Sequence, residues 1–169
     1  MRIGIITISD RSSRGVRPDL TGPALKELVI AQGWQVVQLQ VIPDDLQAIQ
    51  EKLITWSDSN EFDLLLTAGG TGFSPRDITP EATAGVIERD APGLVEAMRA
   101  ESLKQTPHAM ISRARAGIRG HTLIVNLPGS PRAAVENLNV ILPVVEHAVD
   151  LLSDDPRSEA GHRFVDQKG

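Results

Sequence analysis

The chain has 169 residues, of which 41% are hydrophobic, carries a net charge of -5 and contains no cysteine. This length suits one well-packed domain, and the missing cysteines exclude disulfides and cysteine-ligated metals. The acidic balance argues against nucleic-acid binding, and no apolar stretch approaches the roughly 20 residues of a membrane span. Since nothing after Met1 resembles a signal peptide, we expect a cytoplasmic protein.

The first third of the chain alternates strand and helix patterns. Residues 3–8 are apolar without alternation, which is typical of a strand buried on both faces. A polar loop (9–19) follows, and the next residues (21–33) have helical spacing with a glycine stop. A second strand (34–42) and a second helix (43–56), opened by Pro-Asp-Asp, complete this part.

The rest of the chain continues this alternation. The predicted elements are a strand (62–67), a helix capped by Thr79 and ending near Asp90, a helix (94–105), a short strand (109–112), a turn-rich connection (113–120), a strand (122–127) and a long helix starting at Pro131 with Ser130 as its N-cap. We assign 1–152 to one α/β domain. The polar residues 153–169 are predicted to form a tail that is mobile or held by a partner.

Such alternation predicts a three-layer α/β sandwich, in which helices cover both faces of a mostly parallel sheet. Ligands of open α/β sheets bind beyond the carboxyl ends of the strands. Three polar segments (9–11, 69–77 and 128–132) directly follow predicted strands. We therefore expect these segments to meet at one edge of the sheet and form a single pocket.

A glycine-rich turn, 69–72, leads from the third strand towards Asp77. Because glycine tolerates positive φ and has no Cβ, its backbone amides can converge on an anion. The turn lacks the lysine of a P-loop and the spacing of a dinucleotide motif. A carboxylate beside an anion cradle would repel a bare phosphate unless a divalent cation lies between them, or unless it contacts another part of the substrate. Asp77 is thus a candidate Mg²⁺ ligand, and a purely structural turn is the alternative.

Further charged side chains lie near strand ends. Helix capping explains one of the adjacent Asp44 and Asp45 and leaves the other available for function, and Asp10 follows the first strand. Arginines in or beside glycine- or proline-containing segments favour an anionic ligand as a set, although each alone fits a solvated loop: Arg11, Arg14, Arg17, Arg76, Arg113, Arg115, Arg119 and Arg132.

Five separated motifs together resemble one family, the molybdopterin adenylyltransferases of the MogA type, which are similar to the G domain of gephyrin. The motifs are Thr7-Ile8-Ser9-Asp10-Arg11, Pro43-Asp44-Asp45, the segment 67–72, the block 75–83 (Pro-Arg-Asp-Ile-Thr-Pro-Glu-Ala-Thr) and Asn126-Leu127-Pro128-Gly129-Ser130-Pro131. The resemblance covers about residues 2–150. It implies an α/β fold, a homotrimer, and adenylyl transfer from Mg-ATP to molybdopterin with release of pyrophosphate. The product then goes to a molybdenum-insertion protein.

The resemblance also implies the site residues. The two essential aspartates of the family match Asp44 and Asp77, and the cofactor is Mg²⁺ bound with ATP. The positions that match substrate-binding surfaces are Ser9, Asp10, Gly69, Gly70, Thr71, Gly72, Phe73, Ser74, Pro75, Arg76, Ser112, Pro128, Gly129, Ser130 and Pro131.

Three alternatives stay open at this point. A MoaB-type paralogue shares the fold and most motifs, but works in another branch of the pathway or is inactive. A non-catalytic module could bind molybdopterin and pass it on. A nucleotide-binding enzyme with an unrelated substrate, such as a kinase, is disfavoured because the P-loop lysine is missing.

Overall fold

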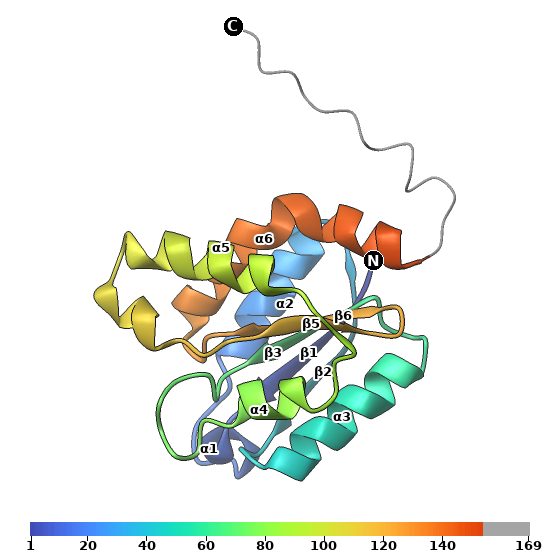
Figure 1. Cartoon of the computed structure of the whole chain (residues 1–169). Helices are drawn as coiled ribbons and strands as arrows, with labels where there is room; N and C mark the ends of the chain where they lie inside the picture. Colours follow the sequence, from blue (N-terminus) through green and yellow to red (C-terminus); the bar gives the residue numbers. More distant parts are fainter. Residues whose placement is uncertain (154–169) are drawn as a thin grey trace, which may run out of the picture.

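The computed structural model describes residues 1–153, which form a six-stranded sheet flanked by helices (Figure 1). The strands are β1 (Arg2–Ile8), β2 (Gln35–Ile42), β3 (Leu64–Ala68), β4 (Arg89–Asp90), β5 (Ala116–Arg119) and β6 (Thr122–Leu127). The helices are α1 (Asp10–Ser13), α2 (Thr21–Ala31), α3 (Leu46–Asp58), α4 (Thr79–Ala84), α5 (Pro92–Leu103), the 3₁₀ helix η1 (Pro107–Ile111) and α6 (Pro131–Leu152). Apart from Ser153, the predicted tail lies outside the described residues.

The sheet has the order β2-β1-β3-β6-β5-β4 and is mostly parallel. Strands β2, β1, β3 and β6 run parallel, whereas β5 is antiparallel to both β6 and β4. Gly120 and His121 alone separate the paired residues Arg119 and Thr122, and a loop of two residues can only join antiparallel strands. The predicted α/β class is confirmed, with an antiparallel edge that the sequence did not predict.

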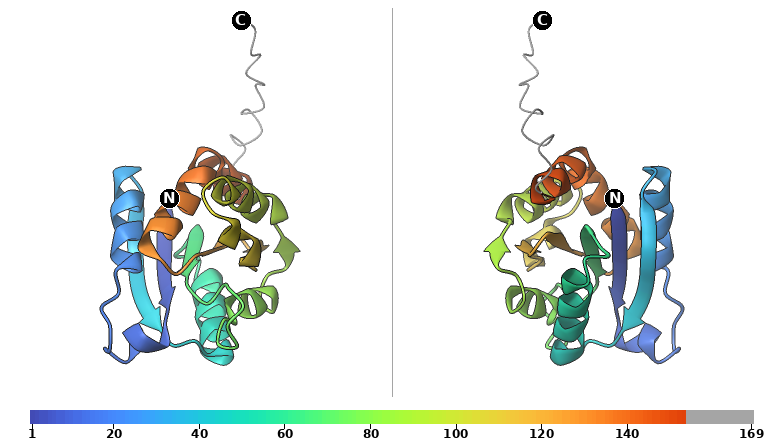
Figure 2. Two further views of the ribbon diagram at one scale, coloured as in Figure 1. Left: turned by 90° about the vertical axis from the view of Figure 1, so that its left-hand side faces the viewer. Right: turned by 90° about the vertical axis from the view of Figure 1, so that its right-hand side faces the viewer.

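Helices cover both faces of the sheet, so that the domain has three layers (Figure 2). Helices α2, α5 and α6 pack on one face, and α3 and α4 pack on the other. Side chains of β1 alternate between the two layers, since Ile3 and Ile5 join the first core and Ile6 and Ile8 the second. A strand buried on both faces needs apolar residues at every position, which explains why this segment shows no polar alternation.

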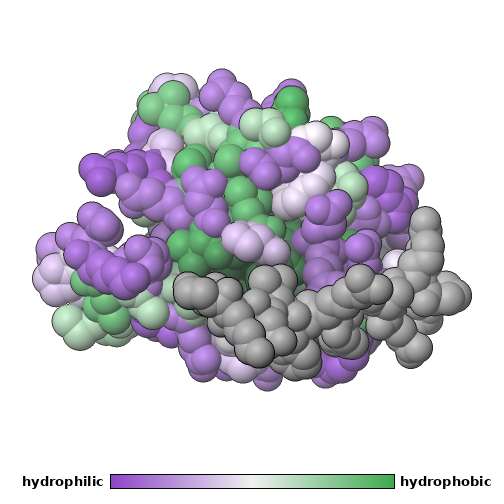
Figure 3. All heavy atoms as spheres, turned by 90° about the horizontal axis from the view of Figure 1, so that it is seen from above, coloured by the Kyte–Doolittle hydropathy of each residue, from purple (hydrophilic) through white to green (hydrophobic). Residues whose placement is uncertain are grey.

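The outer surface of the helix layer formed by α2, α5 and α6 is polar around a strip of apolar side chains (Figure 3). A shallow groove between α5 and α6 is lined by Leu94, Ala97, Val140 and Val144, and Val144 is half exposed. Within residues 1–153, no helix is long and apolar enough to cross a membrane.

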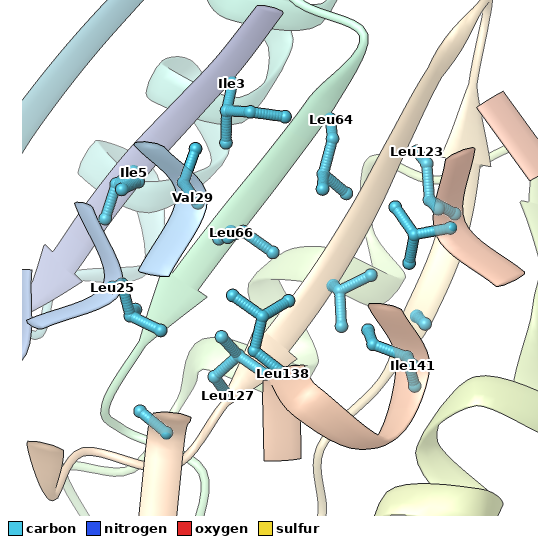
Figure 4. Close-up of a cluster of buried hydrophobic side chains, with 14 of the residues drawn as sticks. Ile3, Ile5, Leu25, Val29, Leu64, Leu66, Leu123, Leu127, Leu138 and Ile141 are labelled. Carbon is cyan, nitrogen blue, oxygen red and sulfur yellow. The ribbon is translucent and has the colours of Figure 1, made fainter. Parts of the chain in front are cut away.

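The larger core lies between the sheet and helices α2, α5 and α6 (Figure 4). Its fully buried side chains come from β1, β3, β6 and the facing helices, and include Ile3, Ile5, Leu25, Val29, Leu64, Leu66, Leu123 and Leu138. Burial of each such side chain stabilises the fold by roughly 1.5–3 kcal/mol before conformational entropy is subtracted. This rigid centre holds the carboxyl ends of the parallel strands in place.

Two short elements near the antiparallel edge differ from their predictions. The helix that begins at Thr79 ends at Ala84 rather than near Asp90, and β4 follows it. The connection 113–120 contains β5. Both strands are held by hydrogen bonds between neighbouring segments, such as the bond from the Ala91 amide, just after β4, to the Ala116 carbonyl. Strands of two to four residues are too short to show an alternating apolar pattern in the sequence.

The predicted short strand 109–112 is also wrong, because the segment 107–111 forms η1. The hydroxyl of Thr106 accepts the amide of His108, and Pro107 occupies the first helical position. A capping threonine followed by proline is a helix-start signal. The strand prediction followed instead from the apolar residues Met110 and Ile111.

We predict that Gly4→Ala lowers the free energy of unfolding by about 1–3 kcal/mol through overpacking. A Cβ at Gly4 would lie 2.6 Å from Leu65 Cδ2, 2.8 Å from Trp56 Cε3 and 2.9 Å from Phe62 Cδ1. Urea unfolding of the two proteins measures the difference. Gly93→Ala is the matched control, because nothing lies within 4 Å of a Cβ there. Equal stability of Gly4→Ala and the parent would contradict the prediction.

Candidate functional site

A polar pocket of about 630 Å³ opens at the carboxyl ends of β1, β2, β3 and β6. The segments 9–11, 69–77 and 128–132 all contribute to it, as predicted from their positions after strands. The predicted site residues that line it are Ser9, Asp10, Asp44, Gly69, Gly70, Ser74, Arg76, Asp77, Gly129, Ser130 and Pro131. The topology therefore brings most of the candidate residues into one cavity.

Two glycine turns pack against each other in the floor of this pocket. Gly69 has φ 111°, and a Cβ there would collide with the carbonyl oxygen of Ile8. A Cβ on Gly129 would in turn lie 3.2 Å from the Cα of Gly69. The hydroxyl of Thr21 donates to the Gly129 carbonyl at 2.8 Å and ties α2 to the second turn. Only glycine allows this approach of three chain segments.

Thr79 fixes the first glycine turn to α4. Its buried hydroxyl donates to the carbonyl of Gly69 at 2.9 Å, and its amide donates to the carbonyl of Gly70 at 3.1 Å. Thr79 is the first residue of α4, and Ile78 occupies the cap position without a side-chain cap. The predicted capping role of Thr79 is therefore wrong, because its hydroxyl serves the turn instead.

Asp10 and Asp44 form a reciprocal pair across the pocket. The amide of Asp10 donates to Asp44 Oδ2 at 2.7 Å, and the amide of Asp44 donates to Asp10 Oδ1 at 3.3 Å. The guanidinium of Arg76 donates twice to Asp10 Oδ2, at 2.8 and 3.0 Å. These bonds join the loops after β1, β2 and β3 through charged and polar groups.

The two carboxylates have opposite electrostatic environments. Burial raises the pKa of Asp44, and repulsion from Asp10 and Asp77 acts in the same direction, although the Asp10 amide and Arg76 oppose them. The hydrogen bonds from Arg76 hold the pKa of Asp10 below its usual range. The charged form is therefore less favourable for Asp44 than for Asp10.

Asp45 is the aspartate that caps α3. The sequence predicted this role for one of the adjacent Asp44 and Asp45. The side chain of Asp45 accepts the amide of Ala48 at 2.9 Å and caps α3. Asp44 lies outside this cap and lines the pocket. The prediction that one of the two aspartates caps the helix is confirmed.

Asp77 closes a tight turn beside the pocket. Its Oδ2 accepts the amide of Ser74 at 2.9 Å, and its own amide donates to the Ser74 carbonyl at 2.8 Å. Within residues 1–153, Oδ1 of Asp77 carries no hydrogen bond, and no three His, Asp or Glu side chains are arranged to hold a metal ion. A free carboxylate oxygen fits one ligand of a Mg²⁺ that also needs substrate phosphates.

A second, smaller cavity of about 250 Å³ lies beyond the glycine turn, against α5, η1 and α6. Four predicted site residues line it rather than the polar pocket: Thr71, Gly72, Ser112 and Pro128. The remaining two, Phe73 and Pro75, line neither cavity, and Phe73 is 67% exposed at the tip of the loop. The two cavities thus lie on either side of the loop 69–77, and most of the predicted site residues line one or the other.

Sequence reasoning missed several pocket residues, of which Asp19 is the most informative. Its carboxylate accepts the amides of Thr21 and Gly22 at 3.0 and 3.1 Å and the hydroxyl of Thr7 at 2.9 Å. An aspartate that accepts the amides two and three residues further on acts as a helix cap, so the position of Asp19 just before the helical pattern is the signal that could have found it. Arg11 and Arg17 also line the pocket, whereas Arg115, Arg119 and Arg132 pair with carboxylates elsewhere.

The fold and the site define an α/β domain with a polar pocket between glycine turns at the carboxyl ends of parallel strands, the place where sheets of this class bind ligands. A family model described as a probable molybdopterin binding domain matches residues 4–147, and the chain belongs to this family. The resemblance seen in the five motifs is thereby confirmed.

Curated relatives support this assignment. The chain is 41% identical to the molybdopterin adenylyltransferase of Helicobacter pylori strain J99, over 90% of this chain and 88% of that protein. It is 41% identical to gephyrin of Dictyostelium discoideum over 97% of this chain and 24% of that protein, and 43% identical to the Drosophila melanogaster protein cinnamon over 90% and 26%. The chain thus spans about a quarter of these two longer relatives.

Solved structures give the same fold. MoaB of Thermus thermophilus matches with a TM-score of 0.86 and 46% identity, covering 92% of this chain and 98% of that one. The Mog protein of Mycobacterium ulcerans matches with a TM-score of 0.84 and 38% identity, covering 89% and 98%.

We predict opposite effects on stability when the two paired aspartates are neutralised. Because folding raises the pKa of Asp44, its ionised form opposes folding, and the free energy of unfolding falls as the pH rises through that pKa. Asp44→Asn keeps the acceptor for the Asp10 amide. It should be at least as stable as the parent at neutral pH, and this advantage should vanish in acid, where both side chains are neutral.

Asp10→Asn is the matched comparison. Folding lowers the pKa of Asp10, so its ionised form stabilises the fold above the unfolded pKa, and this contribution is lost as the pH falls through the folded pKa. The variant should therefore be less stable than the parent at neutral pH and equal to it in acid. Thermal unfolding across the acidic and neutral range measures both differences. Effects of the same sign in the two variants would contradict the assignment.

Proposed function

We propose that the chain is a molybdopterin adenylyltransferase of molybdenum cofactor biosynthesis, which transfers the adenylyl group of Mg-ATP to molybdopterin. One observation carries the proposal: Asp44 and Asp77 lie against different glycines of the same turn. A Cβ on Gly70 would lie 3.2 Å from Asp44 Oδ1, and one on Gly72 would lie 2.9 Å from Asp77 Oδ2. The two carboxylates therefore flank the amides that suit a phosphate.

In this reaction the terminal phosphate oxygen of molybdopterin attacks the α-phosphorus of ATP. A new phosphorus–oxygen bond forms, the bond from the α-phosphorus to the bridging oxygen breaks, and pyrophosphate leaves. Two anions must approach each other, which costs Coulomb energy that cations and backbone amides offset. Arg11, Arg17 and Arg76 line the pocket and supply positive charge. Fixed positioning of the two substrates supplies much of the remaining acceleration.

Asp77 and Asp44 would hold Mg²⁺ together with the phosphates of ATP, and the ion would neutralise phosphate charge. Oδ1 of each carboxylate is without a hydrogen bond among the described residues. In the free protein, burial disfavours the charge of Asp44. A bound divalent cation would stabilise that charge.

The two cavities suit different parts of the substrates. The polar pocket beside Asp44 and Asp77 suits the phosphates, whereas the smaller and more enclosed cavity, lined in part by Val95, Met98 and Ser112, suits a flat heterocycle such as a pterin. The turn 69–72 lies between them, where the phosphate of a pterin bound in the small cavity would reach the α-phosphate of ATP.

The alternative is a MoaB-type or carrier protein that binds molybdopterin without adenylyl transfer. The similarity to the Thermus MoaB structure keeps this alternative open. Both aspartates of the adenylyltransferase pattern are present in the pocket, which favours the enzyme.

The decisive test is incubation of the protein with molybdopterin, ATP and Mg²⁺, followed by measurement of pyrophosphate and adenylylated molybdopterin. We predict that Asp44→Asn and Asp77→Asn each lower the rate about 100-fold or more, the usual effect of removing a group that stabilises transition-state charge. Asp45→Asn is the matched control, since asparagine caps a helix as well as aspartate does. It should keep the parent rate.

One outcome would count against the enzyme and another against the roles of its aspartates. Tight molybdopterin binding without pyrophosphate release would favour the carrier, and a normal rate in either site variant would remove that aspartate from the mechanism.

The proposed setting is the cytoplasm, where a molybdenum-insertion protein would receive the adenylylated product.

We further propose that the protein is a homotrimer. The apolar groove between α5 and α6, with Leu94, Val140 and Val144 on its surface, supports burial against another copy. Analytical ultracentrifugation should give a mass of three chains of 18.2 kDa. A single-chain mass at micromolar concentration would contradict the trimer.

A further inference from the structure

Arg113 lines neither cavity, yet its side-chain hydrogen bonds end on the loop that carries Asp77 and on the helix that follows it. It lies between η1 and β5, about 40 residues further along the chain. Its backbone amide donates to the carbonyl of Thr71 at 2.9 Å. The backbone of Arg113 thus lies beside the start of the turn.

The guanidinium group connects both ends of the loop. Its Nε donates to the carbonyl of Gly72 at 2.7 Å, where the loop begins. Nη2 donates to the carbonyl of Asp77, where the loop ends, and Nη1 pairs with Glu81 in the first turn of α4. One rigid group therefore sets the distance between Gly72 and Asp77, with α4 as a third anchor.

This arrangement depends on the shape of the guanidinium group as well as its charge. Arginine presents its donors in a planar fork, whereas lysine has one ammonium at the end of a flexible chain. The side chain of Arg113 is one-third exposed, and two of its acceptors are neutral carbonyls, so an ion pair alone does not explain its position. A lysine could not hold all three acceptors in the same geometry.

We infer that Arg113 is a positioning residue for the reaction, which holds the loop 72–77 so that the Asp77 carboxylate faces the substrate phosphates. The inference rests on the proposed adenylyl transfer. Inside the loop, Asp77 is fixed only by its turn with Ser74, and the tip with Phe73 is exposed. Without Arg113 the loop keeps its internal turn and the pairing of Arg76 with Asp10, but the distance between Gly72 and Asp77 is no longer fixed by a single group.

The test compares Arg113→Lys with Arg115→Lys. Arg115 belongs to the same segment, and its side chain pairs with Asp90 at the surface, away from both cavities, so that its variant is the matched control. We expect Arg113→Lys to lower kcat about 100-fold, the effect of a misplacement of roughly 1 Å, with little change in KM for either substrate. Arg115→Lys should match the parent.

Hydrogen exchange of the free proteins gives a readout that does not depend on activity. In Arg113→Lys, amides in 72–77 should exchange faster while those of the core strands keep the parent rates. Because Arg113 acts through Asp77, Arg113→Lys should add no further loss to the residual rate of Asp77→Asn. A role confined to overall stability predicts losses that multiply, together with faster exchange throughout the domain.

Other outcomes overturn the inference. An unchanged kcat in Arg113→Lys would exclude a positioning role, and a raised KM with normal kcat would indicate direct substrate binding. If the parent shows no adenylyl transfer, the proposed function and the catalytic part of this inference fall together, while exchange still reports on the loop. If Arg113→Lys does not fold, Glu81→Gln removes only the negative charge of the outer acceptor and should give a smaller loss of kcat in the same direction.

Discussion

The close approach of glycine turns at the carboxyl ends of β1, β3 and β6 is the constraint on which the site depends. Gly69 lies against the carbonyl of Ile8 and against Gly129, so that the backbones of three loops touch where side chains would keep them apart. The parallel strands bring these loop starts to one edge, and the buried core keeps the strand ends in register. The polar pocket is the space that remains above this contact.

The carboxylates of the pocket are of one residue type, but their surroundings make the charge of one favourable and the charge of another unfavourable. Arg76 stabilises the charge of Asp10, while burial and neighbouring carboxylates disfavour the charge of Asp44. Asp77 is bound into a turn through one oxygen, and its other oxygen accepts no hydrogen bond among residues 1–153. In the proposed reaction, cations and substrate phosphates that enter together would make the electrostatic energy of this site more favourable.

Much of the fold could be predicted because strong local signals agree with the tertiary structure. The apolar run of β1, the Ser130 cap of α6 and the capping role of one of Asp44 and Asp45 are examples. The short strands β4 and β5 were missed, since they take their conformation from pairing with neighbours and leave no periodic pattern. The segment of η1 was predicted as a strand because its apolar residues were given more weight than the threonine and proline that start the helix. The role of Thr79 was misread for a similar reason, because its partner Gly69 is ten residues away.

The sequence by itself determined the family, the α/β class and the segments that meet in the pocket, because motifs and strand ends are local properties of the chain. Only the tertiary structure decided that Asp10 pairs with Asp44 and Arg76, that Ser112 belongs to a second cavity, and that Arg113 holds the loop of Asp77. Such contacts join residues more than 30 positions apart, and the direction of a side chain across that separation depends on packing that no local pattern records.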